Sequence, residues 1–351
     1  MHRLIYRQLS RVTVFLLCCI PLASLAAERQ LIILNWSDYI DPALIAKFGQ
    51  RYDARVREVY YSSDDNRTEM LQENNAEDYD LILTSDSDLY LYAKRQWIAP
   101  LDYAKIPNMK HIAPRWIDAF EAAGSYAVPY FLGTTGIVYR SDLVKTPITS
   151  WQQLFRPEPE LQGKIAMVRD SRDIIGMGLK ALGYSANSSD RNQLKEVEAL
   201  LLKQKQHVRT YNYINLDETS AILSGEIVAS LMYSGDALMV AEHNEDLRYV
   251  VPQEGGNIWV DYFTLGGKAK NVDLAYAFLN FINEPENAAQ MAQYVYYATP
   301  NRAAEVLLPP EFLTDPVIYP DQARLESSEF YVRQAPKSLR LRNSISASVF
   351  R

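Results

Sequence analysis

The sequence predicts an α/β protein of two lobes, each a mostly parallel sheet flanked by helices, with a cleft between them. Strand-like and helix-like segments alternate along nearly the whole chain, which is typical of parallel pairing. The alternation forms two sets of comparable size, with no long disordered linker between them. Because clefts between domains are favoured ligand sites, we expect a binding site where the two lobes meet.

The first set begins with a strand, a helix whose first residue is Pro42, and a second strand. Proline suits the first helical turn, where its missing N–H would be unpaired. The predicted elements of this set are Leu31–Leu34, Pro42–Tyr52 and Val56–Tyr60, then helix Thr68–Glu73, strand Asp80–Thr84 and helix Leu89–Arg95. A second set begins near Thr134, with strands Gly136–Tyr139, Lys164–Val168, Val208–Tyr211, Ile227–Met232, Arg248–Val251 and Trp259–Leu265, and helices Asp173–Leu182, Arg191–Gln204, Leu216–Leu223, Val272–Ile282 and Glu286–Tyr294. With crossings near Gly133, Ile258 and Pro300, we expect residues 27–133 and 259–300 in the first lobe, and 134–258 and 301–351 in the second.

The N-terminus has the pattern of a cleaved secretory signal over residues 1–26. Three arginines precede an apolar run over Val12–Ile20, and Ser24-Leu25-Ala26 places small residues before a cleavage site. The run is about half the length that a bilayer-spanning helix needs. We therefore expect an exported, periplasmic protein; an uncleaved membrane anchor is the alternative.

Composition narrows the function classes. Both cysteines, Cys18 and Cys19, lie in the predicted signal, so the mature chain offers no disulfide, thiolate nucleophile or cysteine-ligated metal. The net charge of −7 becomes more negative when the three arginines of the signal are removed. This balance argues against a nucleic-acid partner and is compatible with a cationic ligand. We expect a monomer with no cofactor.

Aromatic and acidic residues recur together where strands of the predicted sheets end. Trp36-Ser37-Asp38-Tyr39 follows the first strand, and the theme returns at Asp170 with Asp173, at Tyr233 with Asp236 and at Trp259 with Asp261. Strand ends border the crevice where α/β sheets bind ligands. A carboxylate offsets the cost of desolvating an ammonium, and an aromatic face covers the methylenes and adds cation–π attraction. The pattern favours an organic cation with an apolar body.

Several short strings stand in a characteristic order and spacing from about Leu31 to Tyr319. They are Asn35-Trp36-Ser37-Asp38-Tyr39-Ile40, Tyr79-Asp80-Leu81-Ile82 leading to Ser85, Val128-Pro129-Tyr130, Leu182-Gly183-Tyr184-Ser185, Pro252-Gln253-Glu254-Gly255-Gly256, Trp259-Val260-Asp261, Phe278-Leu279-Asn280-Phe281 and Ala298-Thr299-Pro300-Asn301. By these strings the chain resembles the spermidine/putrescine-binding periplasmic proteins, which belong to the two-lobed solute-binding superfamily. The fold that this implies is the type II periplasmic-binding-protein fold.

Carried over by position, the resemblance implies a ligand site built from both lobes. Trp36, Ser37, Asp38 and Tyr39 would form one wall, and Ser85, with Asp86 or Ser87, would contact an amine from the first lobe. Asp170 and Asp173 would meet the far amine, Tyr233 would stack where the family usually has Trp, and Asp236 would supply an acid found in putrescine-type members. Trp259 and Asp261 would clamp the ligand centre, Tyr297 would add an aromatic wall, and Tyr331, beside Phe330, falls where the family has a Trp-Gln pair.

The resemblance implies a polyamine-binding protein that closes over spermidine, norspermidine or putrescine and delivers it to an ABC transporter. Facing carboxylates repel without a cation, so we expect the open state to dominate until a ligand binds. A subset of the family reports polyamine levels to a membrane c-di-GMP signalling enzyme, which is the alternative. The basic tail over Lys337–Arg342 is expected to be a solvated arm, or else a docking surface for such a membrane partner.

Two other function classes receive less support from the residues. Tyr296-Tyr297 resembles the adjacent tyrosines of ferric-ion-binding proteins, but His111, His207 and His243 have no ligand spacing with them. An enzyme is not expected, because the chain has no Gly-x-Ser-x-Gly elbow, His-Glu-x-x-His motif or phosphate loop. Asp170 and Asp173 have no nucleophile or metal set beside them to make an acid/base pair productive.

Overall fold

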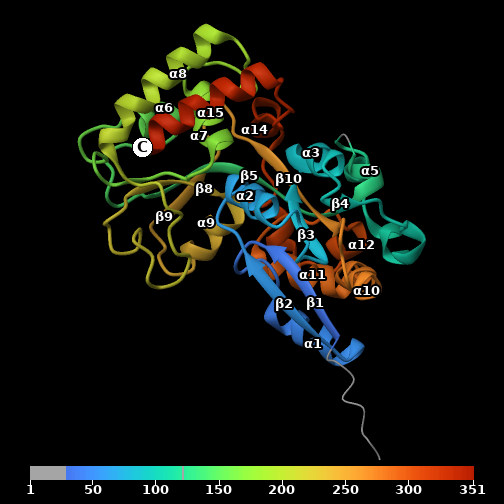
Figure 1. The fold of residues 1–351 in the computed structure, drawn as a ribbon. Coiled ribbons are helices and arrows are strands. Elements are labelled where there is room, and N and C mark those ends of the chain that lie inside the picture. The colour runs from blue at the N-terminus through green and yellow to red at the C-terminus, as the bar shows by residue number, and fades with distance from the viewer. Residues whose placement is uncertain (1–28, 121) are drawn as a thin grey trace, which may run out of the picture.

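The computed structural model describes residues 29–120 and 122–351, arranged as two α/β lobes (Figure 1). The predicted signal over residues 1–26 lies outside the described residues. The strands are β1 (Arg29–Asn35), β2 (Ala54–Tyr60), β3 (Leu81–Ser85), β4 (Ile98–Ala99), β5 (Ala127–Arg140), β6 (Ile165–Ala166), β7 (Val208–Thr210), β8 (Ala229–Tyr233), β9 (Leu247–Val250) and β10 (Ile258–Gly266). The predicted α/β two-lobed fold class is confirmed.

The strands follow the order β2-β1-β3-β10-β5-β8-β6-β7, with β4 beside β10 and β9 beside β5. Within the first lobe β1 is parallel to β2 and β3, and within the second β6 is parallel to β7 and β8. The two central strands, β5 and β10, run antiparallel to their neighbours. The start of β10 therefore lies beside the end of β3, so that both contribute side chains to one edge of the sheet.

Strand β5 passes from one lobe to the other. Its first half, up to Thr134, pairs with β10, and its second half, from Thr135, pairs with β8 and β9. The sequence predicted only Gly136–Tyr139 as a strand, because the preceding residues contain Pro129, Gly133 and two threonines. The crossing predicted near Gly133 thus lies inside a continuous strand that joins the lobes.

Six of the helices of eight or more residues correspond to predicted helices, although α2 begins four residues before the predicted Thr68, whereas α9 and α15 were not predicted. They are α1 (Pro42–Tyr52), α2 (Asp64–Glu73), α7 (Ser171–Ala181), α8 (Arg191–Gln204), α9 (Ser234–Ala241), α10 (Val272–Ile282), α11 (Pro285–Val295) and α15 (Pro336–Phe350). Shorter helices are α3 (Leu89–Lys94), α4 (Pro114–Ile117), α5 (Ala123–Tyr126), α6 (Trp151–Phe155), α12 (Arg302–Glu305), α13 (Pro310–Thr314) and α14 (Gln322–Ser327), with 3-10 turns η1 (Asp86–Asp88), η2 (Tyr103–Lys105), η3 (Pro107–His111) and η4 (Lys205–His207).

The predicted helix over Leu216–Leu223 is wrong: this segment forms turns. The Asp217 carboxylate accepts hydrogen bonds from the amide and the hydroxyl of Thr219. Such a local side-chain bond offers the backbone an alternative to helical pairing. The predicted solvated arm at the C-terminus is also wrong, because α15 packs on the second lobe through the fully buried Ile345 and Val349.

Each lobe has two apolar clusters, one on each face of its sheet. In the first lobe Leu31 and Ile33 belong to one cluster, whereas Leu34 and Ile82 belong to the other. Alternate residues of a strand point to opposite faces, so both faces of this sheet are buried. The division of the chain between the lobes stays a prediction. The first-lobe cluster that contains Leu31 also includes four residues after Pro300, namely Ala304, Leu308, Phe312 and Ile318. Their packing favours a boundary between the lobes near residue 320 rather than residue 300.

Candidate functional site

A cavity of about 1320 Å³ lies between the lobes, at the edge where β1, β3 and β8 end and β10 begins. All fifteen residues predicted for the site line this cavity. They are Trp36, Ser37, Asp38, Tyr39, Ser85, Asp86, Ser87, Asp170, Asp173, Tyr233, Asp236, Trp259, Asp261, Tyr297 and Tyr331. The structure therefore brings these residues together around one cavity, while their role as ligand contacts stays a prediction.

The segment after β1 forms the first wall. Trp36 packs against Tyr61 with ring centroids 4.4 Å apart. The chain then turns sharply, because Asp38 adopts a left-handed conformation with φ of 55°. Ser37 and Asp38 are exposed, whereas Tyr39 is buried and donates a hydrogen bond to Asp261 Oδ2 at 3.0 Å. This wall thus offers one exposed carboxylate at the mouth and one aromatic hydroxyl inside.

Asp261 is a buried acid contributed by the first lobe. It lies opposite Ser85 in the antiparallel pairing of β10 with β3 and is 7% exposed. Burial, with a smaller contribution from Asp64, raises the pKa of Asp261 to about 7, against the opposing effects of Arg67 and Tyr39. A cation placed beside it would favour its ionised form.

Three aromatic rings surround the centre of the cavity. Trp259 makes edge contacts with Tyr297 at 4.9 Å and with Tyr233 at 6.0 Å between ring centroids. Its indole lies against the backbone of β5, where a Cβ on Gly133 would be 2.5 Å from Trp259 Cζ2. Glycine is therefore required for this close approach. The buried Trp259 Nε1 has no hydrogen-bond partner among the residues that the structure describes.

Asp173 presents an acid from the second lobe. It lies in the first turn of α7, and its two oxygens accept hydrogen bonds from Tyr233 and Tyr331, each at 2.8 Å. Burial raises the pKa of Asp173, although both tyrosines oppose the shift. Asp170 is the N-cap of the same helix and accepts from the amides of Arg172 and Asp173. Burial and the charge of Asp173 raise the pKa of Asp170 well above its usual range.

Asp236 repeats this arrangement on α9. Its oxygens accept from Tyr297 Oη at 2.7 Å and from Tyr213 Oη. Burial raises the pKa of Asp236 despite these two bonds. Tyr213 also stacks on Tyr233, with centroids 5.9 Å apart and planes inclined by 26°. Sequence reasoning missed Tyr213, which comes from a loop with no acid beside it in the sequence.

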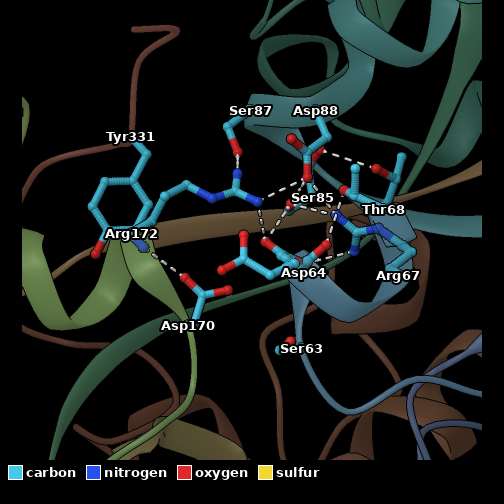
Figure 2. A network of polar contacts seen from close by, with 12 residues as sticks. Ser63, Asp64, Arg67, Thr68, Ser85, Ser87, Asp88, Asp170, Arg172 and Tyr331 are labelled. Atoms are coloured by element: carbon cyan, nitrogen blue, oxygen red, sulfur yellow. Dashed lines mark hydrogen bonds and ion pairs between the residues drawn. The ribbon is translucent and has the colours of Figure 1, made fainter. Parts of the chain in front are cut away.

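Two of the first-lobe residues expected to meet an amine, Ser85 and Ser87, are in contact with arginines of the chain itself. Ser85 Oγ accepts from Arg67 and donates to Asp64, and Ser87 Oγ accepts from Arg172 Nη1 (Figure 2). Asp86 accepts from the amide of Val260 at 3.3 Å. Burial raises the pKa of Asp86 well above its usual range. Sequence reasoning missed this arginine network, which joins residues far apart in the chain.

The lining as a whole suits a slender organic cation. Asp173, Asp236 and Asp261 come from different elements, are buried or half-buried, and each already holds a tyrosine hydroxyl. Among the described residues no cluster of three or more His, Cys, Asp or Glu side chains is placed to hold a metal ion. The hydroxyls of Tyr296 and Tyr297 donate to Glu242 and Asp236 respectively. No helix in the described part of the chain could span a bilayer.

Several known proteins are similar to this chain in sequence or structure over most of its length. Residues 43–319 match the family described as bacterial extracellular solute-binding protein. The spermidine/putrescine-binding periplasmic protein of Escherichia coli is 29% identical over 86% of each chain, and the norspermidine sensor of Vibrio cholerae is 27% identical over 92% of this chain and 89% of that one. A structure described as a putative spermidine/putrescine ABC transporter from Listeria monocytogenes is 33% identical, with a TM-score of 0.83 over 92% of this chain and 99% of that one. The chain belongs to the family of bacterial extracellular solute-binding proteins.

Proposed function

We propose that the protein is a periplasmic binding protein that closes over one polyamine of the spermidine, norspermidine or putrescine class and presents it to an ABC transporter. The observation that carries this proposal is the convergence of Asp173, Asp236 and Asp261 with Trp259 in one cavity between the lobes. One relative named above is described as spermidine/putrescine-binding and another as a norspermidine sensor, which supports the same ligand class. We propose no catalytic activity.

The acids favour a triamine. Asp173 and Asp236 come from the second lobe and Asp261 from the first, so three ammonium groups would each have a carboxylate within the cavity. An unpaired buried ammonium is costly, and a pairing carboxylate removes most of that cost. The Trp259, Tyr233 and Tyr297 rings would cover the methylenes and contribute about 0.5–2 kcal/mol for each good cation–π contact.

Isothermal titration calorimetry with putrescine, cadaverine, norspermidine and spermidine tests this proposal. We expect one site of about micromolar affinity or tighter for a triamine. Asp261→Asn should weaken binding by at least tenfold, whereas Glu311→Gln, an exposed acid of the same lobe, should leave it unchanged. Failure of every polyamine to bind would refute the ligand class, and putrescine binding tenfold more tightly than either triamine would refute the triamine preference.

The second candidate function is a sensor that presents its ligand state to a membrane c-di-GMP signalling enzyme. It is favoured by the likeness to the norspermidine sensor, which extends over 92% of this chain. Deleting the gene and measuring both polyamine uptake and c-di-GMP separates the two. Loss of uptake supports transport, whereas intact uptake with an altered c-di-GMP response to norspermidine supports sensing.

A further inference from the structure

Arg172 makes ion pairs across the interface between the two lobes. It lies in the first turn of α7, a helix buried in the second-lobe core. Its Nη2 lies 2.9 Å from Asp64 Oδ2 and 2.8 Å from Asp88 Oδ2, and its Nη1 donates to Ser87. Asp64 begins α2, while Ser87 and Asp88 belong to η1 after β3, so all three acceptors are in the first lobe. Figure 2 shows the guanidinium extending toward these groups.

The first-lobe groups are held in place by a second arginine. Arg67 is fully buried, and its guanidinium contacts Asp64 Oδ1 at 2.7 Å and Asp88 Oδ2 at 2.6 Å. Its Nε donates to Tyr92 Oη at 3.1 Å, which fixes the orientation of the fork. The Asp64 and Asp88 oxygens are therefore positioned to receive another guanidinium before the lobes meet. A planar fork suits paired carboxylate oxygens better than an ammonium does.

The charges of Asp64 and Asp88 are balanced only when both Arg67 and Arg172 are present. Two carboxylates and Arg67 alone leave one negative charge, and Arg172 neutralises it. Burial would raise the pKa of Asp64, yet Arg67 and then Arg172 outweigh it and lower that pKa. The side chain of Arg172 is only 22% exposed, so the pair is partly shielded from water and salt. An exposed ion pair contributes little, whereas removing Arg172 from this partly buried bridge would leave an uncompensated negative charge between the lobes.

Other contacts between the lobes lie on neighbouring elements. The amide and the hydroxyl of Ser171 each donate to Asp65 at 3.3 Å. The segment around Phe330 is held to the second lobe by Asn187, and the Phe330 ring packs on Phe120 of the first lobe with centroids 5.3 Å apart. These contacts also need no bound cation. The chain therefore contains its own means of holding the lobes together on this side of the cavity.

We propose that Arg172 is a latch between the lobes, which allows the protein to populate its closed conformation before a polyamine binds. This deepens the proposed function, on which it rests for its consequence for affinity. The measured dissociation constant equals the intrinsic one divided by the closed fraction, so a latch that raises this fraction tightens binding without touching the ligand. If removing Arg172 lowers the closed fraction to about a tenth of its wild-type value, the measured dissociation constant rises about tenfold.

Small-angle X-ray scattering of the full chain, with and without saturating spermidine, tests the latch. Arg172→Gln should increase the radius of gyration of the ligand-free protein, and spermidine should restore the compact value. Arg172→Lys should give a smaller increase, because an ammonium keeps the charge but loses the planar fork. The matched control is Arg209→Gln, which removes an arginine of an ion pair within the second lobe and should scatter as the wild type does.

Titration calorimetry on the same variants gives the second readout. Spermidine should bind Arg172→Gln about tenfold more weakly than the wild type, and Arg209→Gln should bind normally. Unchanged scattering and affinity in Arg172→Gln would overturn the proposal. Tighter binding would also overturn it, since the arginine would then compete with the ligand for the acids. Because ligand-free scattering depends on no particular cargo, failure of the polyamine assignment would leave the latch result interpretable.

Discussion

Lowering the pH from 8 to 6 should weaken polyamine binding, because the cavity acids must be ionised to pair with an ammonium. Burial raises the pKa of Asp261 to about 7 in the protein without a bound cation. This group is about nine-tenths ionised at pH 8 and about one-tenth ionised at pH 6, so its contribution alone predicts about a tenfold loss of affinity. Burial also raises the pKa values of Asp173 and Asp236, so their protonation acts in the same direction.

The sign follows from linkage between proton and ligand binding. A cation stabilises the ionised carboxylate and lowers its pKa, so binding releases protons near neutral pH. Calorimetry at pH 7 in two buffers of different ionisation enthalpy measures the number released, and we expect about half a proton or more from Asp261 alone. In Asp261→Asn the number should fall together with the affinity.

Two results would refute this reasoning. An affinity that is flat between pH 6 and pH 8 would mean that Asp261 is already ionised in the ligand-free protein or does not meet the ammonium. An affinity that rises as the pH falls would mean that a neutral carboxyl group is the preferred partner. Glu311→Gln, which leaves the cavity unchanged, should keep the wild-type pH dependence and serves as the control.

Three further predictions concern single contacts. Gly133→Ala should weaken spermidine binding at least tenfold with the circular dichroism spectrum retained, since the new Cβ would be 2.5 Å from Trp259 and would displace the indole; wild-type affinity would contradict this. Tyr331→Phe should cost about 1 kcal/mol of binding, because Asp173 loses one of two donors, while Tyr184→Phe, whose hydroxyl meets exposed Glu196, should bind normally in the same calorimeter. The melting temperature of the ligand-free protein should fall from pH 5 to pH 8. A carboxyl group whose pKa is raised in the folded state stabilises the fold at low pH, and this stabilisation is lost as the pH rises through that pKa. Calorimetric scans showing a rise would contradict the raised pKa of Asp261.

Much of the site could be predicted because its residues lie in short local strings at the ends of strands. Trp36 to Tyr39 directly follow β1, as expected at the edge where parallel strands end, whereas Trp259 and Asp261 lie near the start of β10 and reach the same edge because β10 runs antiparallel to β3. Helices such as α8 and α10 were predicted to the residue because apolar positions recur with helical spacing. The turns over Leu216–Leu223 were not predicted, because a hydrogen bond from the Thr219 amide to the Asp217 carboxylate replaces helical hydrogen bonding there.

The arginine network could not be predicted in the same way, and it changes the electrostatics of the cleft. Arg67 and Arg172 are 105 residues apart, and neither stands in a string that suggests a pair with Asp64 or Asp88. The acids alone predict that facing carboxylates hold the lobes apart until a ligand binds. Because Arg67 and Arg172 both pair with Asp64 and Asp88, this part of the interface between the lobes attracts rather than repels. Among the cavity acids, Asp173, Asp236 and Asp261 are bound to tyrosine hydroxyls, and burial favours their neutral form, which holds their mutual repulsion down until an ammonium ionises them.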